Sequence, residues 1–162
     1  MNPFTRNFRF WLPVLLWLGV IAYESLRLSS HVTGTYLWTF FRWLHLSISP
    51  TAFAELHHVL RKVGHITGYG ILCLLTFRAW FHTLDGVVLK ALRLRCAVLA
   101  LSLTLITAVL DEWHQNIDPA RTSSVWDVGL DMIGGLGFLL VALFVFRIWR
   151  NRAVEELEPV SV

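Results

Sequence analysis

The 162-residue sequence contains few charged side chains and few cysteines. Only 15% of its residues are Asp, Glu, Lys or Arg, whereas 56% are hydrophobic. This balance excludes a disordered chain, a collagen-like chain and an ordinary soluble domain. The two cysteines, Cys73 and Cys96, lie far apart without a CxxC motif, which excludes a disulfide scaffold and a zinc motif. The formal charge of +3 is too small and too dispersed to indicate a nucleic-acid partner.

The hydrophobic residues gather in four segments that contain no Asp, Glu, Lys or Arg. These segments are residues 10–23, 63–77, 96–110 and 132–146. Crossing about 30 Å of hydrocarbon takes a helix of about 20 residues, so each span must continue into its polar flanks. We predict one all-α, polytopic membrane domain over residues 1–162, with four transmembrane helices. The predicted spans lie near residues 8–28, 58–81, 94–115 and 125–147, and residues 148–162 form a solvated tail.

The first span is expected to be a retained helix. Glu24, Ser25 and Arg27 follow its apolar run, and no small-residue cleavage pattern precedes the next aromatic segment. A cleaved secretory signal would end in such a pattern. We therefore count this segment among the transmembrane helices.

An aromatic segment separates the first two spans. Phe, Trp and Tyr make up 14% of the chain, a bias typical of proteins with rings at the membrane interface. Residues 36–46 place apolar side chains, such as Leu37 and Phe41, at helical spacing. This pattern predicts an interfacial or re-entrant helix. Ser49 and Pro50 then predict the N-cap and the first position of the next long helix.

The distribution of Lys and Arg predicts how the chain crosses the membrane. With the N-terminus inside, nine of these residues flank the spans on the inner side and five on the outer side. Because cytoplasmic flanks are enriched in Lys and Arg, both termini are expected to be cytoplasmic.

Polar residues from all four spans are expected to meet at the outer end of the helices. They are Glu24 and Ser25; Lys62, His65 and Tyr69; Asp111, Glu112 and Gln115; and Asp127 and Asp131. A charged residue at the centre of a span costs roughly 2.5–3.5 kcal/mol, so these side chains should face one another or a wet cavity.

Helical spacing refines the expected arrangement of this cluster. His58, Lys62, His65 and Tyr69 are separated by four, three and four residues, which predicts one stripe on the second span. Small residues accompany the polar ones in the second and fourth spans: Gly64, Gly68, Gly134, Gly135 and Gly137. They predict tight packing below a cavity that opens outward.

The ordered set of polar motifs resembles the VanZ-like family of bacterial membrane proteins. The motifs are Glu24-Ser25, Lys62-x-x-His65-x-x-x-Tyr69, Asp111-Glu112-x-x-Gln115, Arg121 and Asp127-x-x-x-Asp131-x-x-Gly134, and the resemblance covers about residues 10–147. It implies a multi-pass protein of the bacterial cytoplasmic membrane. The founding member is associated with low-level resistance to the glycopeptide teicoplanin, which implies a role at the cell envelope. His114 departs from the pattern and is expected at a lipid-facing or interfacial position.

Three interpretations of the cluster stay open. It is an ion-pair network that holds the helices together, an enzyme site, or a site that binds or translocates a lipid-linked envelope component. The candidate catalytic residues are Glu24, Lys62, His65, Asp111, Glu112 and Asp127, and the candidate substrate contacts are Ser25, Tyr69, Gln115, Arg121 and Asp131.

In the enzyme interpretation, a carboxylate of this cluster is the general base and His65 is the proton shuttle. Lys62 and Arg121 would hold a phosphate or carboxylate of a lipid-borne substrate. The expected partners are membrane lipids, including a lipid-linked cell-wall precursor. No cofactor is predicted. A divalent metal on His65, Asp111, Glu112 and Asp127 stays open as an alternative, although HExxH is absent.

Overall fold

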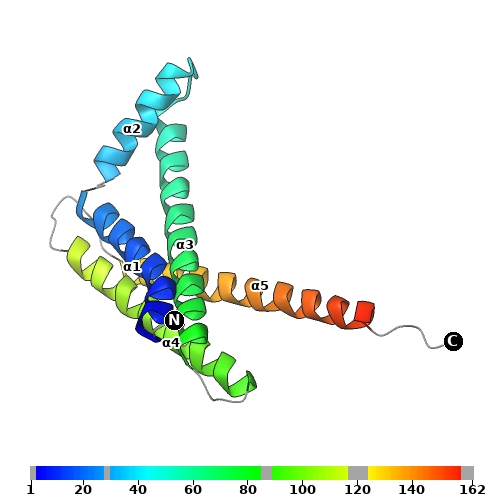
Figure 1. Cartoon of the computed structure of the whole chain (residues 1–162). Helices are drawn as coiled ribbons and strands as arrows, with labels where there is room; N and C mark the ends of the chain where they lie inside the picture. Colours follow the sequence, from blue (N-terminus) through cyan, green and yellow to red (C-terminus); the bar gives the residue numbers. More distant parts are fainter. Residues whose placement is uncertain (1–2, 28–29, 85–88, 117–123, 158–162) are drawn as a thin grey trace.

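The computed structural model describes residues 3–27, 30–84, 89–116 and 124–157, and in these residues every element is helical (Figure 1). The five helices are α1 (Pro3–Arg27), α2 (Ser30–Trp43), α3 (Pro50–Thr83), α4 (Leu89–Gln115) and α5 (Val125–Leu157). The prediction of an all-α protein is confirmed for this part of the chain. α5 continues to Leu157, past the predicted end of the last span at residue 147, so the expected tail begins as helix.

Three of the described helices are long and apolar enough to cross a membrane. They contain Asn7–Arg27, Ala91–Gln115 and Val125–Trp149 and correspond to the predicted first, third and fourth spans. The predicted second span, 58–81, lies within α3, where glycines and polar side chains such as His65 interrupt the apolar run. The count of four spans is therefore not confirmed.

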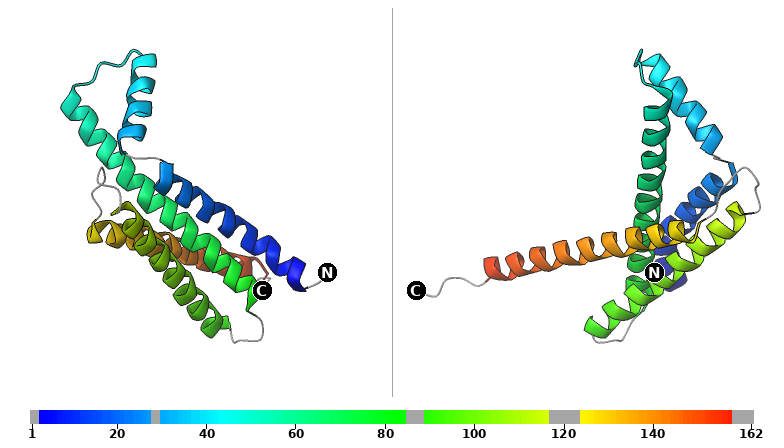
Figure 2. Two further views of the ribbon diagram at one scale, coloured as in Figure 1. Left: turned by 90° about the vertical axis from the view of Figure 1, so that its left-hand side faces the viewer. Right: turned by 180° about the vertical axis from the view of Figure 1, so that it is seen from behind.

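α3 is the central element of the fold. It contacts each of the other helices, most extensively α5, and it is the longest helix, with 34 residues. α1 and α4 lie along its C-terminal half, whereas α2 folds back against its first turns (Figures 1 and 2). α5 crosses α3, and its C-terminal half extends away from the other helices. The polar ends of several helices therefore meet around the middle of α3.

The hairpin between α2 and α3 has defined helix ends. Ser49 is the N-cap of α3, its Oγ accepts the Ala52 N–H at 3.2 Å, and Pro50 follows it, so the predicted helix start is confirmed. α2 starts at Ser30, earlier than predicted, and ends in a Schellman motif. In this motif His45 adopts a left-handed backbone conformation with φ 54°, which reverses the chain.

Close packing of α5 on α3 and α4 depends on glycine. A Cβ atom added to Gly134 would overlap the carbonyl oxygen of Ile66, and one added to Gly135 would lie 3.2 Å from Thr104. The predicted close approach is thus present at these two positions. A Cβ atom at Gly64 or Gly68 would meet nothing within 4 Å, so this GxxxG pair does not form a tight helix contact at its Cα atoms.

Candidate functional site

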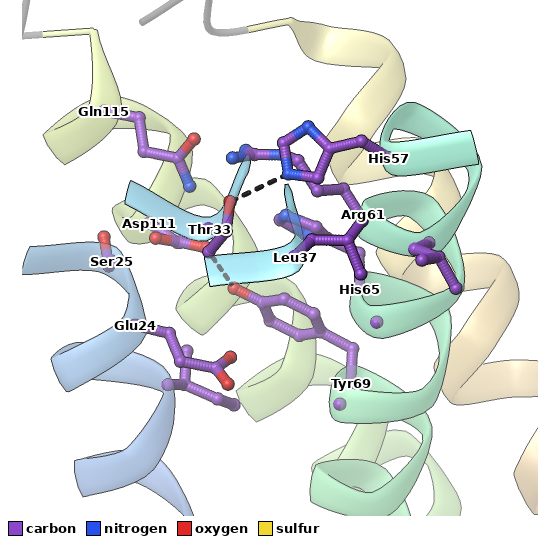
Figure 3. A pocket seen from close by; sticks show the side chains of 14 residues that line it. Glu24, Ser25, Thr33, Leu37, His57, Arg61, His65, Tyr69, Asp111 and Gln115 are labelled. Carbon is purple, nitrogen blue, oxygen red and sulfur yellow. Dashed lines mark hydrogen bonds between the residues drawn. The ribbon is translucent and has the colours of Figure 1, made fainter. Parts of the chain in front are cut away.

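A pocket of about 310 Å³ lies where the C-terminal ends of α1 and α4 meet α2 and the N-terminal half of α3 (Figure 3). Its lining consists of Ile21, Glu24, Ser25, Thr33, Leu37, His57, Leu60, Arg61, Gly64, His65, Gly68, Tyr69, Asp111 and Gln115. Charged and hydrogen-bonding side chains share the wall with leucine and isoleucine side chains. The pocket is therefore amphipathic.

The structure places part of the predicted cluster in this pocket. Glu24, Ser25, His65, Tyr69, Asp111 and Gln115 line it. Glu112, Asp127 and Asp131 lie outside the lining, Lys62 is exposed on another side of α3, and Arg121 lies outside the described residues.

Sequence reasoning missed several residues of the lining. The lining residues that were not among the candidate site residues are Ile21, Thr33, Leu37, His57, Leu60, Arg61, Gly64 and Gly68. His57, Arg61 and His65 are spaced by four residues, so the same helical rule that indicated a stripe through Lys62 also permits this neighbouring one.

Tyr69 and Asp111 join α3 to α4 at the pocket wall. The Tyr69 hydroxyl donates to Oδ2 of Asp111 at 2.9 Å (Figure 3). Oδ1 of Asp111 is buried and accepts no hydrogen bond from the described residues. A buried acceptor without a donor is costly, so Oδ1 is suited to a donor that enters the pocket.

His65 and Asp131 join α3 to α5. Nδ1 of His65 lies 3.1 Å from Oδ1 of Asp131, whose side chain is fully buried. The carboxylate therefore orients the imidazole ring and leaves Nε2 for a group in the pocket. Such a carboxylate–imidazole pair has the geometry required for proton transfer.

Glu112 and Asp127 make contacts at helix ends. Oε2 of Glu112 accepts the Ser124 N–H at 2.9 Å, and Ser124 Oγ accepts the Trp126 N–H at 3.2 Å at the start of α5. Asp127 lies in the first turn of α5, where a negative charge is favoured by the helix dipole. In this geometry Glu112 ties the end of α4 to the start of α5.

His114 reaches the edge of the pocket. Its side chain is exposed, and Nδ1 lies 3.5 Å from Oγ of Ser25. The residue expected at a lipid-facing or interfacial position therefore also contacts a lining residue. It joins α4 to α1.

α2 lies beside the pocket and contacts α3 through Thr33 and a group of rings. Thr33 Oγ1 and His57 Nε2 lie 2.9 Å apart, and the ring of Phe53 contacts Trp38 and Phe41. The pKa of His57 is lowered from its ordinary value, first by desolvation and then by the positive charges of Arg61 and His58. His57 is therefore neutral near pH 7 in this arrangement.

We expect α2 to detach from α3 as the pH falls from about 7.5 to about 5. Desolvation is the first cause of the lowered pKa of His57 and is relieved when α2 leaves, so the undocked state binds a proton more readily and acid favours it. The distance between spin labels at the exposed positions Tyr36 and Glu55 should increase over this range. His57→Gln keeps a hydrogen-bonding group and should abolish the pH dependence, whereas His58→Gln should retain it. A pH response that persists in His57→Gln would contradict this assignment.

The described residues contain no cluster of potential metal ligands. Within residues 3–27, 30–84, 89–116 and 124–157, no group of three or more His, Cys, Asp and Glu side chains is placed to hold a metal ion. The polar side chains instead pair across helices, as His65 does with Asp131.

The fold and the site together define a class: an all-helical protein with three helices long and apolar enough to cross a membrane and an amphipathic pocket at their ends. Residues 10–147 match the family model described as VanZ/LLP1, and the chain belongs to this family. The resemblance found in the sequence is thereby confirmed over the same residues. No curated protein and no solved structure matches the chain.

Proposed function

We propose that this protein binds the polar head of a lipid-linked cell-envelope component in the pocket. The observation that carries the proposal is the amphipathic lining, which lies at the ends of apolar helices. A volume of about 310 Å³ falls within the range of about 300–1,000 Å³ that is common for small-molecule sites. In this proposal α3 also crosses the membrane, as the predicted second span, which brings the number of spans to four. Both termini are cytoplasmic, and the pocket faces outward from the bacterial cytoplasmic membrane.

The lining groups suit an anionic, hydroxyl-bearing head. The guanidinium group of Arg61 binds a phosphate or carboxylate, and Oδ1 of Asp111 accepts from a hydroxyl or amide group. Leu37 and Leu60 contact the first methylene groups of the lipid chain. Glu24 faces the same space from α1 and favours a head that also carries hydrogen-bond donors.

Glycopeptide susceptibility follows from the same proposal. A protein that holds a lipid-linked cell-wall precursor changes how much of that precursor an extracellular antibiotic meets. We therefore propose that the pocket influences susceptibility to teicoplanin.

A second candidate function is modification of the bound head. The pair of His65 and Asp131 favours it, because a buried carboxylate orients an imidazole whose other nitrogen serves the pocket. In this form of the proposal His65 takes a proton from a hydroxyl group or water whose oxygen attacks an ester of the head. The bond to the leaving ester oxygen breaks, and the protonated His65 gives that oxygen its proton.

Filling the pocket tests the binding proposal. A leucine at position 64 projects into the pocket from a site where a Cβ atom meets nothing within 4 Å. Gly137→Leu is the matched control, because position 137 is equally open and lies outside the lining. Cells lacking the protein would be complemented with each variant, and the lipids that copurify with the protein would be identified by mass spectrometry.

We expect Gly64→Leu to lose the copurifying lipid-linked species and to give the teicoplanin susceptibility of the deletion strain. Gly137→Leu should behave as wild type in both assays. A Gly64→Leu protein that retains the lipid and the phenotype would contradict the proposal and favour a purely structural polar cluster. A covalent change in an envelope lipid that requires the wild-type protein would identify the catalytic form.

A further inference from the structure

A second cavity, of about 250 Å³, lies at the other end of α3, between α3, α4 and α5. It occupies the region where α5 crosses α3 and turns away from the other helices (Figures 1 and 2). Phe77, Phe81 and Leu143 contribute to an apolar wall, whereas Arg78, His82 and Arg93 contribute positive or titratable groups. This cavity therefore combines an apolar slot with cationic groups, whereas the lining of the first pocket carries charges of both signs.

The positive charge at this cavity is not balanced by nearby carboxylates in the described part of the chain. Within that part, neither Arg78 nor Arg93 forms an ion pair with a carboxylate. Their guanidinium groups instead lie over aromatic rings, Arg93 at 5.1 Å from the ring centroid of Phe146 and Arg78 at 5.4 Å from that of Phe10. Rings hold these cations in place without neutralising them.

His82 lines the same cavity and lies within reach of the positive charge of Arg78. Its ring stacks on Phe10 at a centroid distance of 4.0 Å. The pKa of His82 is lowered, first by desolvation and then by the positive charges of Arg78 and Arg9. An anion at this cavity would therefore meet the positive charges of Arg78 and Arg93 and no described carboxylate.

We propose that this cavity binds one anionic phospholipid of the surrounding leaflet. Its phosphate lies on the side of Arg78 and Arg93, and an acyl chain fills the apolar slot. Charge complementarity selects this occupant, because a zwitterionic lipid carries its own cation and an apolar peptide carries no phosphate. This cavity shares no lining residue with the pocket of the proposed function, so either proposal can be refuted without affecting the other.

Native mass spectrometry of the purified protein in detergent tests the site, with phosphatidylglycerol and phosphatidylcholine as probes. The variant Arg78→Gln/Arg93→Gln removes two charges from the cavity. Arg95→Gln/Arg147→Gln removes two charges from exposed positions outside the lining and is the matched control. We expect the first variant to bind phosphatidylglycerol about tenfold more weakly than wild type, and the control to bind it nearly as well as wild type. Wild type should bind phosphatidylcholine more weakly than phosphatidylglycerol.

Equal losses in the two double variants would overturn the proposal, because they would show general attraction between a basic protein and an anionic lipid. Equal binding of the two lipids by wild type would also overturn it. Ala142→Trp adds a second test, since Ala142 lines the slot and a larger side chain there displaces the acyl chain while both arginines remain. Unchanged phosphatidylglycerol affinity in Ala142→Trp, in protein of wild-type thermal stability, would overturn the assignment of the slot.

Discussion

Gly134→Ala is expected to lower the thermal stability of the purified protein markedly. The added Cβ atom would overlap the Ile66 carbonyl oxygen and lie 2.8 Å from the Ile66 Cα atom. Both are backbone atoms, which cannot rotate away, so α3 and α5 would have to separate along their extensive contact. Overpacking of this kind costs about 1–3 kcal/mol or more. We expect a fall of about 3–10 °C in apparent Tm in detergent.

Gly137→Ala is the control for this prediction. It lies on the same helix, and its Cβ atom would meet nothing within 4 Å. Alanine is a better helix former than glycine by about 1 kcal/mol, so this variant should be as stable as wild type or more stable. If Gly134→Ala were as stable as Gly137→Ala, α5 could not lie against Ile66 as described.

Under the catalytic form of the proposed function, His65→Gln should lower turnover about 10²- to 10⁴-fold. The variant removes the group that exchanges a proton with the bound head, and His65 is only partly buried, so the fold should survive. Asp131→Asn preserves the shape of the partner but removes the charge that orients and stabilises the protonated ring, so it should also reduce turnover. The measurement is mass spectrometry of envelope lipids from complemented cells, with thermal stability recorded for the same proteins.

Two comparisons separate chemistry from structure at this pair. If His65 and Asp131 act as a unit, the double variant should lose no more turnover than His65→Gln alone. His58→Gln removes an exposed histidine outside the pocket and should leave turnover unchanged. Identical lipid profiles in wild type, His65→Gln and the deletion strain would contradict the catalytic form and leave the binding form.

Local signals in the sequence were sufficient for much of the fold. Ser49 and Pro50 predict the start of α3 because capping depends on neighbouring residues alone. The apolar runs predict α1, α4 and α5 because length and composition determine whether a helix can span. The alternation of helix directions was enough to bring Glu24, His65 and Asp111 to one pocket.

The rotation of α3 could not be predicted in the same way. Residues one position apart on a helix differ by about 100°, so Arg61 and Lys62 face different directions although both neighbour His65 in sequence. Polar residues occur on both faces of α3, so its sequence does not indicate which face lines the pocket. α3 packs on α5 where Gly134 meets Ile66, and in this orientation of α3 Arg61 faces the pocket. Such a contact between distant segments leaves no local signal.

The second cavity was also hidden in the sequence. In the sequence, Arg78 and Arg93 contributed only to the count of Lys and Arg residues that predicts the orientation of the chain in the membrane. Their common cavity depends on the crossing of α5 over α3, and the nearly uniform apolar surface of α5 gives no indication of which face packs.

α3 is longer than a lipid bilayer is thick. At about 1.5 Å per residue, its 34 residues extend about 51 Å, whereas a bilayer measures about 40–45 Å even with its headgroups. In the proposed function α3 crosses the membrane, and a steeply oriented helix of this length carries its first turns, together with α2, clear of the lipid surface. A water-soluble macromolecule can touch these first turns without entering the membrane, and an antibody fragment raised against them would report which side of the cell they occupy.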